Sequence, residues 1–218
     1  MTPSVLSRIP GCEWPAIPSD VGAQSLALLY QLQQSERLPP ESLQAAQFRQ
    51  LQRLFTDAMQ TMPLWKERLE SAGYRAGMPV DAAVLRAIPV LTRAAVQQLG
   101  ELLFNRGLGS RHGGVHQGQT SGSTGMPVKY LQTDLTMLFW RVLTLREHLW
   151  QGRDFSGKLA AIRSNVERGR SSTWGAATEQ VFETGPGVSL NIREDVAVQL
   201  DLVVAEAPQY FLTHPSNL

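Results

Sequence analysis

Residues 188–213, VSLNIREDVAVQLDLVVAEAPQYFLT, decide the fold class. The segment VSLNI at 188–192 predicts a strand, the apolar spacing from 195 to 207 predicts a helix, and YFLT at 210–213 predicts another strand. LAAI at 159–162 predicts one more strand earlier in the chain. Because strands that alternate with helices are typical of α/β proteins, we expect an α/β sheet over this part of the chain.

Two shorter strands and a long helix are predicted upstream of this region. Extended segments at 115–119 and 127–132 flank a loop, and a helix is predicted from Thr133 or Asp134 to Gln151. The large aromatic residues of this helix recur at helical spacing, which favours a core position. They are Phe139, Trp140 and Trp150.

The segment after LAAI is a polar loop rich in Ser and Arg. We expect its arginines to be solvated, with contact to an anion or to a phosphate of coenzyme A (CoA) as the alternative. They are Arg163, Arg168 and Arg170.

The first half of the chain is predicted to be helical. Residues 21–105 carry apolar side chains at steps of three and four, with Pro63 restarting a helix and Thr92 capping a later one. Residues 1–20 contain four prolines and predict an extended arm, and the composition changes at Arg106, where glycines become frequent. We therefore expect an arm at 1–20, a helical lobe at 21–105 and an incomplete α/β subdomain at 106–218.

Composition and charge exclude several classes of protein. The net charge of +1 gives no electrostatic reason to bind nucleic acid or an anionic membrane. The single Cys12 excludes an intramolecular disulfide and a cysteine-rich zinc site. No stretch resembles a secretory signal or the roughly 18 unbroken apolar residues of a membrane span. We expect a cytoplasmic protein.

The segment with the clearest chemical meaning is TSGSTGMP at 120–127. Glycines let the backbone approach an anion closely, and Ser and Thr hydroxyls add hydrogen-bond donors to the backbone N–H groups. Six successive residues restricted to Thr, Ser and Gly, set between two predicted strands, favour a phosphate-binding loop over an ordinary polar turn.

Two competing motifs are weaker. Residues 152–158 match the spacing of a nucleotide-binding Walker loop, but Leu159 stands where Ser or Thr should ligate magnesium, and the segment precedes a strand instead of a helix. A turn after a helix explains it better. His112 and His116 are four residues apart, but the two glycines between them disfavour the helix that a metal pair would need, so we predict no metal site. No GxSxG nucleophile motif is present.

The loop at 120–127 resembles the phosphate-binding signature of the adenylate-forming enzymes, the superfamily of acyl-CoA synthetases, luciferases and nonribosomal adenylation domains. The surrounding sequence is most similar to the phenylacetate-CoA ligase branch, from about residue 40 onward. The residues that carry this closer likeness are Met62 to Leu69, Gly73, Ile88 to Arg93, Trp140, Arg146, Gly152 and Thr213 to Ser216.

The resemblance implies an ATP-dependent ligase that converts a carboxylic acid and Mg-ATP to an acyl-adenylate, and then transfers the acyl group to CoA or another thiol. The residues implied in holding the ATP phosphates are Thr120, Ser121, Gly122, Ser123, Thr124 and Gly125. Lys129 is a further candidate, but many relatives place Lys directly after Pro127, and the shift by one residue moves the side chain to the other face of a strand. His214 and Trp140 are candidates for the acyl pocket. The catalytic residues and the acid are not identified, and a homodimer is left open.

In the family, the adenine loop, the magnesium carboxylate, the ribose-binding Asp and the mobile C-terminal domain all follow the region that this chain matches. We therefore expect an N-terminal part of such a ligase that does not turn over alone, whether its end at Leu218 is natural or a truncation. Two alternatives are kept. One is a non-catalytic, truncated or degenerate relative that acts as a protein-interaction module, and the other is a nucleotide hydrolase that uses the loop at 152–158.

Overall fold

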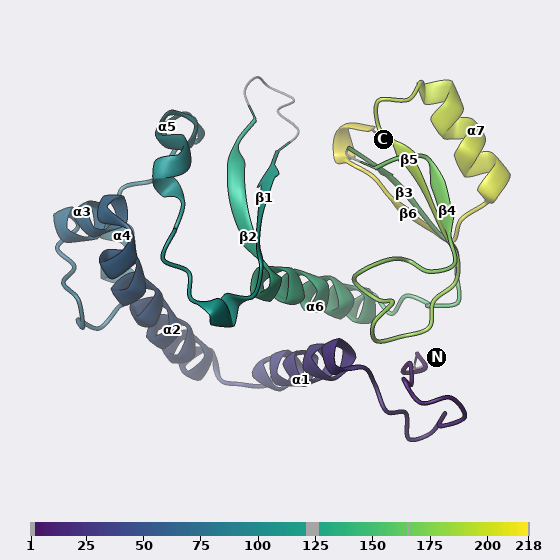
Figure 1. Cartoon of the computed structure of the whole chain (residues 1–218), viewed down its shortest axis with the longest axis horizontal. Coiled ribbons are helices and arrows are strands. Elements are labelled where there is room, and N and C mark those ends of the chain that lie inside the picture. The colour runs from purple at the N-terminus through teal and green to yellow at the C-terminus, as the bar shows by residue number, and fades with distance from the viewer. Residues whose placement is uncertain (1–2, 121–126, 165, 218) are drawn as a thin grey trace. The chain divides into compact units, whose positions relative to one another are not determined.

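The computed structural model describes residues 3–120, 127–164 and 166–217. The chain forms two compact units (Figure 1). The helical unit comprises residues 33–136, and the sheet unit comprises residues 1–32 together with 137–218. Among the residues that the structure describes, no helix is long and apolar enough to cross a membrane.

The helical unit is built around one small core. Phe55 and Tyr74 meet edge to face with ring centroids 5.4 Å apart, and Leu69 and Val80 complete the buried cluster. Met62, between the first two helices, has an extended backbone, so the chain restarts at Pro63 as predicted. The elements are α2 (Pro40–Thr61), α3 (Pro63–Ser71), α4 (Ala82–Ala87), α5 (Arg93–Leu99), η1 (Gly100–Leu103), η2 (Ser110–His112), β1 (Val115–Gln119) and β2 (Lys129–Thr133).

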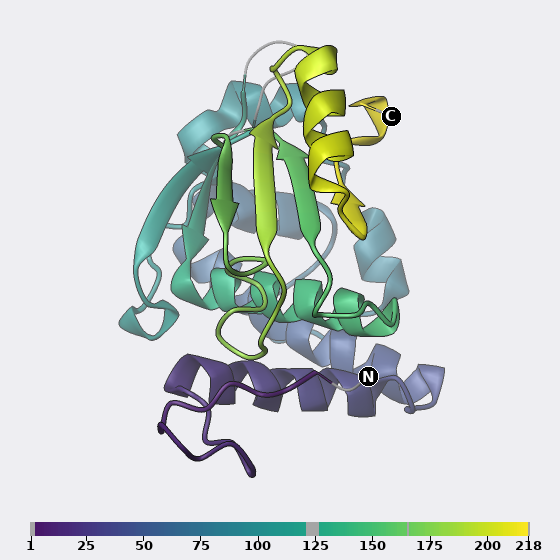
Figure 2. The ribbon, with the colours of Figure 1, turned by 90° about the vertical axis from the view of Figure 1, so that its right-hand side faces the viewer.

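The sheet unit holds a four-stranded sheet in the order β4-β5-β3-β6. Figure 2 shows the strands side by side, with α7 in yellow. Strand β3 is parallel to both neighbours, whereas β4 runs antiparallel to β5 at the edge. The elements are α1 (Asp20–Ser35), α6 (Asp134–Trp150), β3 (Leu159–Arg163), β4 (Gly169–Ser171), β5 (Gly187–Asn191), α7 (Val196–Glu206), β6 (Tyr210–Leu212) and η3 (Pro215–Asn217).

The two faces of the sheet differ. Ile162 of β3 and Leu190 of β5 lie opposite each other and pack with Leu202 of α7 into a buried cluster. Because successive residues of a strand point to opposite faces, Leu159 and Ala161 lie on the other face. These two side chains are only partly buried, so the face away from α7 stays partly open.

A second core of the sheet unit joins α1 to α6. Leu29 of α1 packs with Val142 and Leu145 of α6 in one buried cluster. The N-terminal arm follows the same unit: the Leu6 N–H donates to the Val181 carbonyl over 2.8 Å, and Val5 forms a β-bridge with Phe182. The arm is therefore part of the sheet unit.

The division of the chain differs from the predicted boundary near residue 105. The first helix joins the sheet unit because its leucines pack on α6. Residues 106–136 join the helical unit, where Gly107 approaches α2 so closely that a Cβ there would lie 3.1 Å from Thr61 Cγ2. These contacts connect residues far apart in sequence, which a change of composition at Arg106 does not reveal.

Most predicted elements are found within one or two residues of their expected ends, and the mixed α/β class holds. Two expectations were wrong. Strand β4 forms inside the predicted polar loop. The aromatic residues Phe139, Trp140 and Trp150 are 42%, 45% and 61% exposed and are not core residues, because α6 buries the neighbouring stripe of Val142, Leu145 and His148.

One backbone position is strained. Ala207 ends α7 in the left-handed region, with φ 41° and ψ 55°, where a Cβ is unfavourable. We expect Ala207→Gly to raise the free energy of unfolding by about 0.5–1 kcal/mol in urea titrations. Ala205→Gly, inside the same helix and exposed, should lower it by a similar amount. Equal effects of both substitutions would contradict strain at Ala207.

Candidate functional site

The predicted phosphate loop is set on an antiparallel hairpin. Strands β1 and β2 pair from Val115 opposite Thr133 to Gln119 opposite Lys129. Beyond this ladder the Thr120 N–H donates to the Val128 carbonyl over 2.9 Å, and the Val128 N–H donates to Thr120 Oγ1 over 3.0 Å. The two strands that flank the predicted loop are therefore present, and the Thr120 hydroxyl extends their pairing beyond the ladder.

The remaining loop residues of the prediction lie outside the described part of the chain. They are Ser121, Gly122, Ser123, Thr124 and Gly125. Lys129 is the first residue of β2 and is exposed.

The base of the hairpin is held by one carboxylate. Asp134 Oδ2 accepts the Gly114 N–H over 2.6 Å, and Asp134 Oδ1 lies 3.1 Å from His116 Nε2. Gly113 has φ 76°, and a Cβ there would lie 2.5 Å from the same carboxylate. His112 ends a short 3₁₀ helix and His116 lies in β1, so the two histidines do not share a helix face, as predicted.

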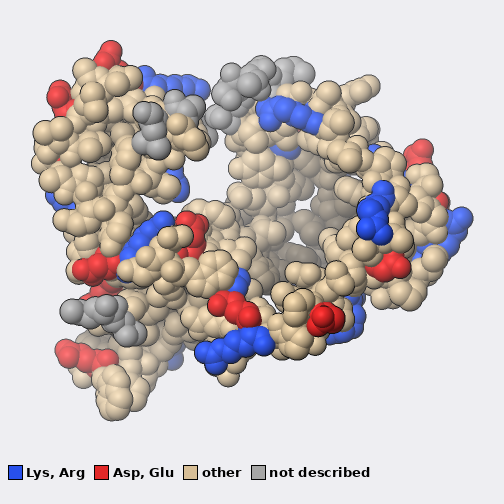
Figure 3. Space-filling view, turned by 180° about the vertical axis from the view of Figure 1, so that it is seen from behind, with Lys and Arg blue, Asp and Glu red and all other residues tan. Residues whose placement is uncertain are grey.

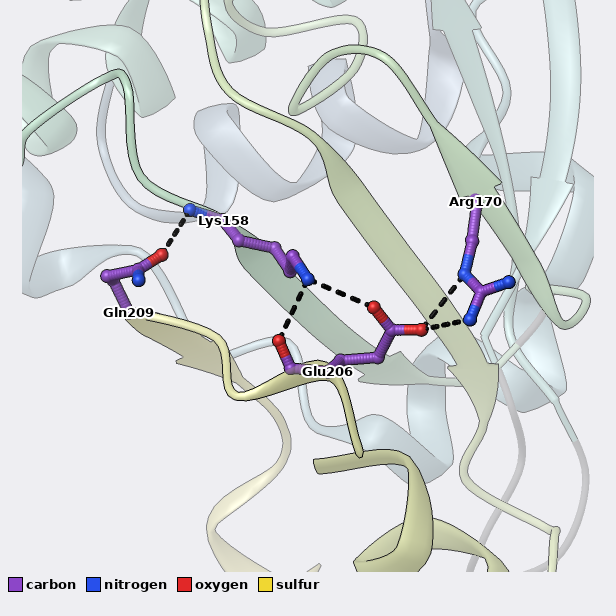
Figure 4. Close-up of polar contacts among 4 residues, drawn as sticks. All are labelled: Lys158, Arg170, Glu206 and Gln209. Atoms are coloured by element: carbon purple, nitrogen blue, oxygen red, sulfur yellow. Dashed lines mark hydrogen bonds and ion pairs between the residues drawn. The ribbon is translucent and has the colours of Figure 1, made fainter. Parts of the chain in front are cut away.

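The lysine of the rejected Walker motif has a structural role (Figure 4). Lys158 Nζ donates to Glu206 Oε2 over 3.1 Å and to the Glu206 carbonyl over 2.9 Å. Arg170 of β4 donates from Nε to Glu206 Oε1 over 2.9 Å and also binds this oxygen through Nη2. The segment at 152–158 follows α6 and precedes β3, as predicted. Arg170 is exposed, as expected for a solvated arginine, and it also forms an ion pair with Glu206 that was not predicted.

These cations control the titration of the carboxylate that they surround. Glu206 is buried, and hydrogen bonds from Arg170 and then Lys158 hold the pKa of its carboxyl below the ordinary value. Glu206 thus remains charged at neutral pH and ties the end of α7 to β3 and β4. Because Lys158 is paired with Glu206, the segment at 152–158 has no free lysine to bind nucleotide phosphates.

The sheet unit contains a cavity of about 660 Å³ against the open face of the sheet. Trp140 and His148 of α6 form one wall, and Leu159 and Ala161 of β3 form another. Its further lining includes Arg163 and Trp174, and the end of β6. Trp140, a candidate for the acyl pocket, lines this cavity, whereas exposed His214 is not among the lining residues.

His148 is the buried titratable group of this cavity. Its Nδ1 lies 2.6 Å from Arg153 Nη1, and because a guanidinium only donates, Nδ1 must be the acceptor and Nε2 must carry the ring proton. Burial, and then the positive charge of Arg153, lower the pKa of the imidazole from its ordinary value of 6.5. The ring is therefore neutral.

Three residues of the cavity were not predicted from the sequence: His148, Arg153 and Trp174. Trp174 lies in a loop without regular structure, and its ring contacts His148, Phe155 and Tyr210 at centroid distances of 5.2 to 5.3 Å. The position of His148 three residues after Leu145 was the only local sign that it lies on the buried stripe of α6.

The charged surface is mixed. On the face in Figure 3, basic and acidic side chains are interspersed and most of the surface carries neither. No group of three or more His, Cys, Asp or Glu side chains arranged to hold a metal ion occurs in the described ranges. Comparison with models of known protein families and with curated protein sequences finds no match for this chain.

The contact between Lys158 and Glu206 can be tested by Lys158→Met. We expect a lower urea midpoint for the sheet unit, because the buried carboxylate loses one cation, and unchanged affinity for pyrophosphate in calorimetric titrations. Lys66→Met, on the exposed surface of α3, is the matched control and should change neither value. Loss of pyrophosphate binding in Lys158→Met would restore the Walker interpretation.

The lowered pKa of His148 predicts a pH dependence of stability. Between pH 6.5 and the lower pKa of the native state, the unfolded chain binds a proton that the native chain does not, so stability decreases as pH falls. We expect the free energy of unfolding to decrease from pH 7 to pH 5, and His148→Gln to flatten this decrease. His214→Gln, at an exposed position, should retain the slope of the unmodified chain.

Proposed function

We propose that this chain is the N-terminal part of an ATP-dependent ligase that activates a carboxylic acid as an acyl-adenylate and passes it to CoA or another thiol. The observation that supports this proposal is the pairing of β1 with β2, extended by two hydrogen bonds between Thr120 and Val128, on either side of the sequence segment SGSTGMP. The backbone N–H groups and hydroxyls of a Thr-, Ser- and Gly-rich segment are donors that suit an anion.

The chemistry of this segment suits a leaving group. Pyrophosphate is released when a carboxylate attacks the α-phosphate of ATP, and neutral donors fixed around the β- and γ-phosphates stabilise the charge that develops on it. In the proposal these donors come from Thr120 to Gly125. Lys129 is a neighbouring cation at the start of β2, where it is exposed to solvent.

Of the residues proposed to bind phosphate, the structure describes Thr120 and Lys129. The described residues include no cluster of carboxylates for Mg²⁺, and we assign no magnesium ligand to this chain. Adenine, ribose and CoA likewise receive no assigned contact. The proposal concerns the phosphate loop and the fold that supports it.

A second candidate function is a non-catalytic interaction module. The exposed side of α7 favours it, since Val196, Leu200 and Val204 are 65%, 59% and 78% exposed and lie one helical turn apart. Binding of a partner protein to this apolar stripe would require no nucleotide. The two candidates therefore make opposite predictions for ATP-dependent chemistry.

The deciding experiment is ATP-dependent pyrophosphate release with a panel of aryl and aliphatic carboxylic acids. It should be run on this chain and on the longest natural protein that contains it. Release that requires both ATP and one class of acid supports the ligase. Absence of release from both proteins, together with absence of pyrophosphate binding, would favour the interaction module.

The loop itself is tested by Ser123→Ala and Thr124→Ala. Each should remove one hydrogen bond to a charged phosphate, worth about 1.5–3 kcal/mol, which corresponds to roughly 10- to 150-fold weaker pyrophosphate binding. Ser110→Ala, at an exposed position in η2, is the control and should bind as the unmodified chain does. Normal binding by both loop variants would remove the phosphate role from this segment.

A further inference from the structure

The cavity of the sheet unit has the size and lining of a small-molecule site. Its volume of about 660 Å³ lies within the range of roughly 300–1,000 Å³ that is usual for ligand pockets. Every lining residue belongs to the sheet unit, so the cavity is formed by that unit alone. It is also independent of the loop at 120–127 and of the function proposed for that loop.

Aromatic side chains give the cavity flat walls. Trp174 is held in place by its Nε1–H, which donates to the Gly157 carbonyl over 2.8 Å, and by an edge contact with Tyr210 at 5.3 Å between centroids. Trp140 lines the cavity from α6. Because the polar atom of Trp174 already has a partner, this residue offers its ring, and such a surface favours a planar apolar ligand.

Arg163 provides a positive charge that no acidic side chain of the described residues neutralises. It is partly buried at the end of β3, and its guanidinium has no hydrogen bond or ion pair with a described residue. The other arginine of the cavity, Arg153, is bound to His148 and lies 3.6 Å from Glu147. A guanidinium that lines a cavity without an acidic partner favours an anionic ligand.

The other polar groups of the lining suit a ligand that accepts hydrogen bonds better than they suit a cation. Neutral His148 carries its proton on Nε2, so the ring adds a donor and no positive charge. The Tyr210 hydroxyl accepts the Asp154 N–H over 2.6 Å, and Gln209 Oε1 accepts the Lys158 N–H over 2.6 Å. The one acidic side chain of the lining, Glu147, already forms an ion pair with Arg153.

We propose that this cavity binds a planar aromatic molecule that carries one anionic group, with Arg163 pairing to the anion and Trp174 contacting the ring. The anion can be a carboxylate of an organic acid or the phosphate of a nucleotide. Both have the same chemistry toward a guanidinium, and the probes below separate them.

The test measures binding of four probes to the whole chain by calorimetry and by quenching of tryptophan fluorescence. The probes are 2-naphthoate, its neutral analogue 2-naphthamide, adenosine 5′-monophosphate and adenosine. We expect one of the two anions to bind at least 10-fold more tightly than its neutral partner. Preference for naphthoate identifies an organic acid, and preference for the monophosphate identifies a nucleotide.

Variants of the lining assign this binding to the cavity. Arg163→Met should weaken binding of the anionic probe at least 10-fold and abolish the preference for the anion over its neutral analogue. Arg163→Lys should keep part of that preference. Arg168→Met is the matched control, since Arg168 is exposed in the same connection and does not line the cavity. Ala161→Leu should block binding of both the anionic probe and its neutral analogue, because the larger side chain fills the space in front of β3.

Three results would overturn the proposal. They are absence of binding by all four probes, equal affinity of anionic and neutral probes, and anion binding that Arg163→Met and Ala161→Leu leave unchanged. Unfolding midpoints of the variants, measured in parallel, show whether each is folded, and Ala161→Leu tests the cavity even if Arg163→Met does not fold. Because the naphthoate pair needs neither ATP nor the loop at 120–127, failure here is distinguishable from failure of the proposed ligase.

Discussion

The alternation of side chains along β3 determines the arrangement of the sheet unit. This strand has hydrogen-bonded neighbours on both sides, so it cannot shift without breaking two parallel ladders. Its buried residues Ala160 and Ile162 require a cover, which α7 provides. Leu159, Ala161 and Arg163 then lie on the opposite face and line the cavity. A shift by one residue would exchange the two sets.

The helix that covers this strand is fixed at its end by charge. Glu206 is almost fully buried and receives hydrogen bonds from Lys158, just before β3, and from Arg170 of β4. Three segments distant in sequence thus meet at one carboxylate (Figure 4). The contact gives the lysine of the segment with Walker spacing a structural role.

Local patterns predicted the elements well because they depend on local physics. The spacing of LAAI and of residues 195–207, Pro63 at a helix start, and the side chain of Thr92 that caps α5 all act within a few residues. Strand β4 was missed because its three residues pair only through β5. The exposure of Trp140 and Trp150 was missed because α6 is apolar on more than the one face that it buries.

The candidate sites show the same limit. The loop at 120–127 could be located from its composition, and its two flanking strands are present. The cavity could not, since Trp174, His148 and Arg163 come from a loop, a helix and a strand that only the fold brings together. Arg170 and Arg163 are close in sequence and similar in context, yet one is neutralised by Glu206 and the other has no described partner.

The bond between Arg153 and His148 gives the cavity a constant charge. Protonation of the imidazole at Nδ1 would displace the guanidinium, and the lowered pKa of His148 favours the uncharged ring at neutral pH. Near neutral pH, a change in the affinity of an ionisable guest would then reflect the titration of the guest. A weak acid would bind in its ionised form and dissociate when it is protonated. The charge of the cavity would not change in this process.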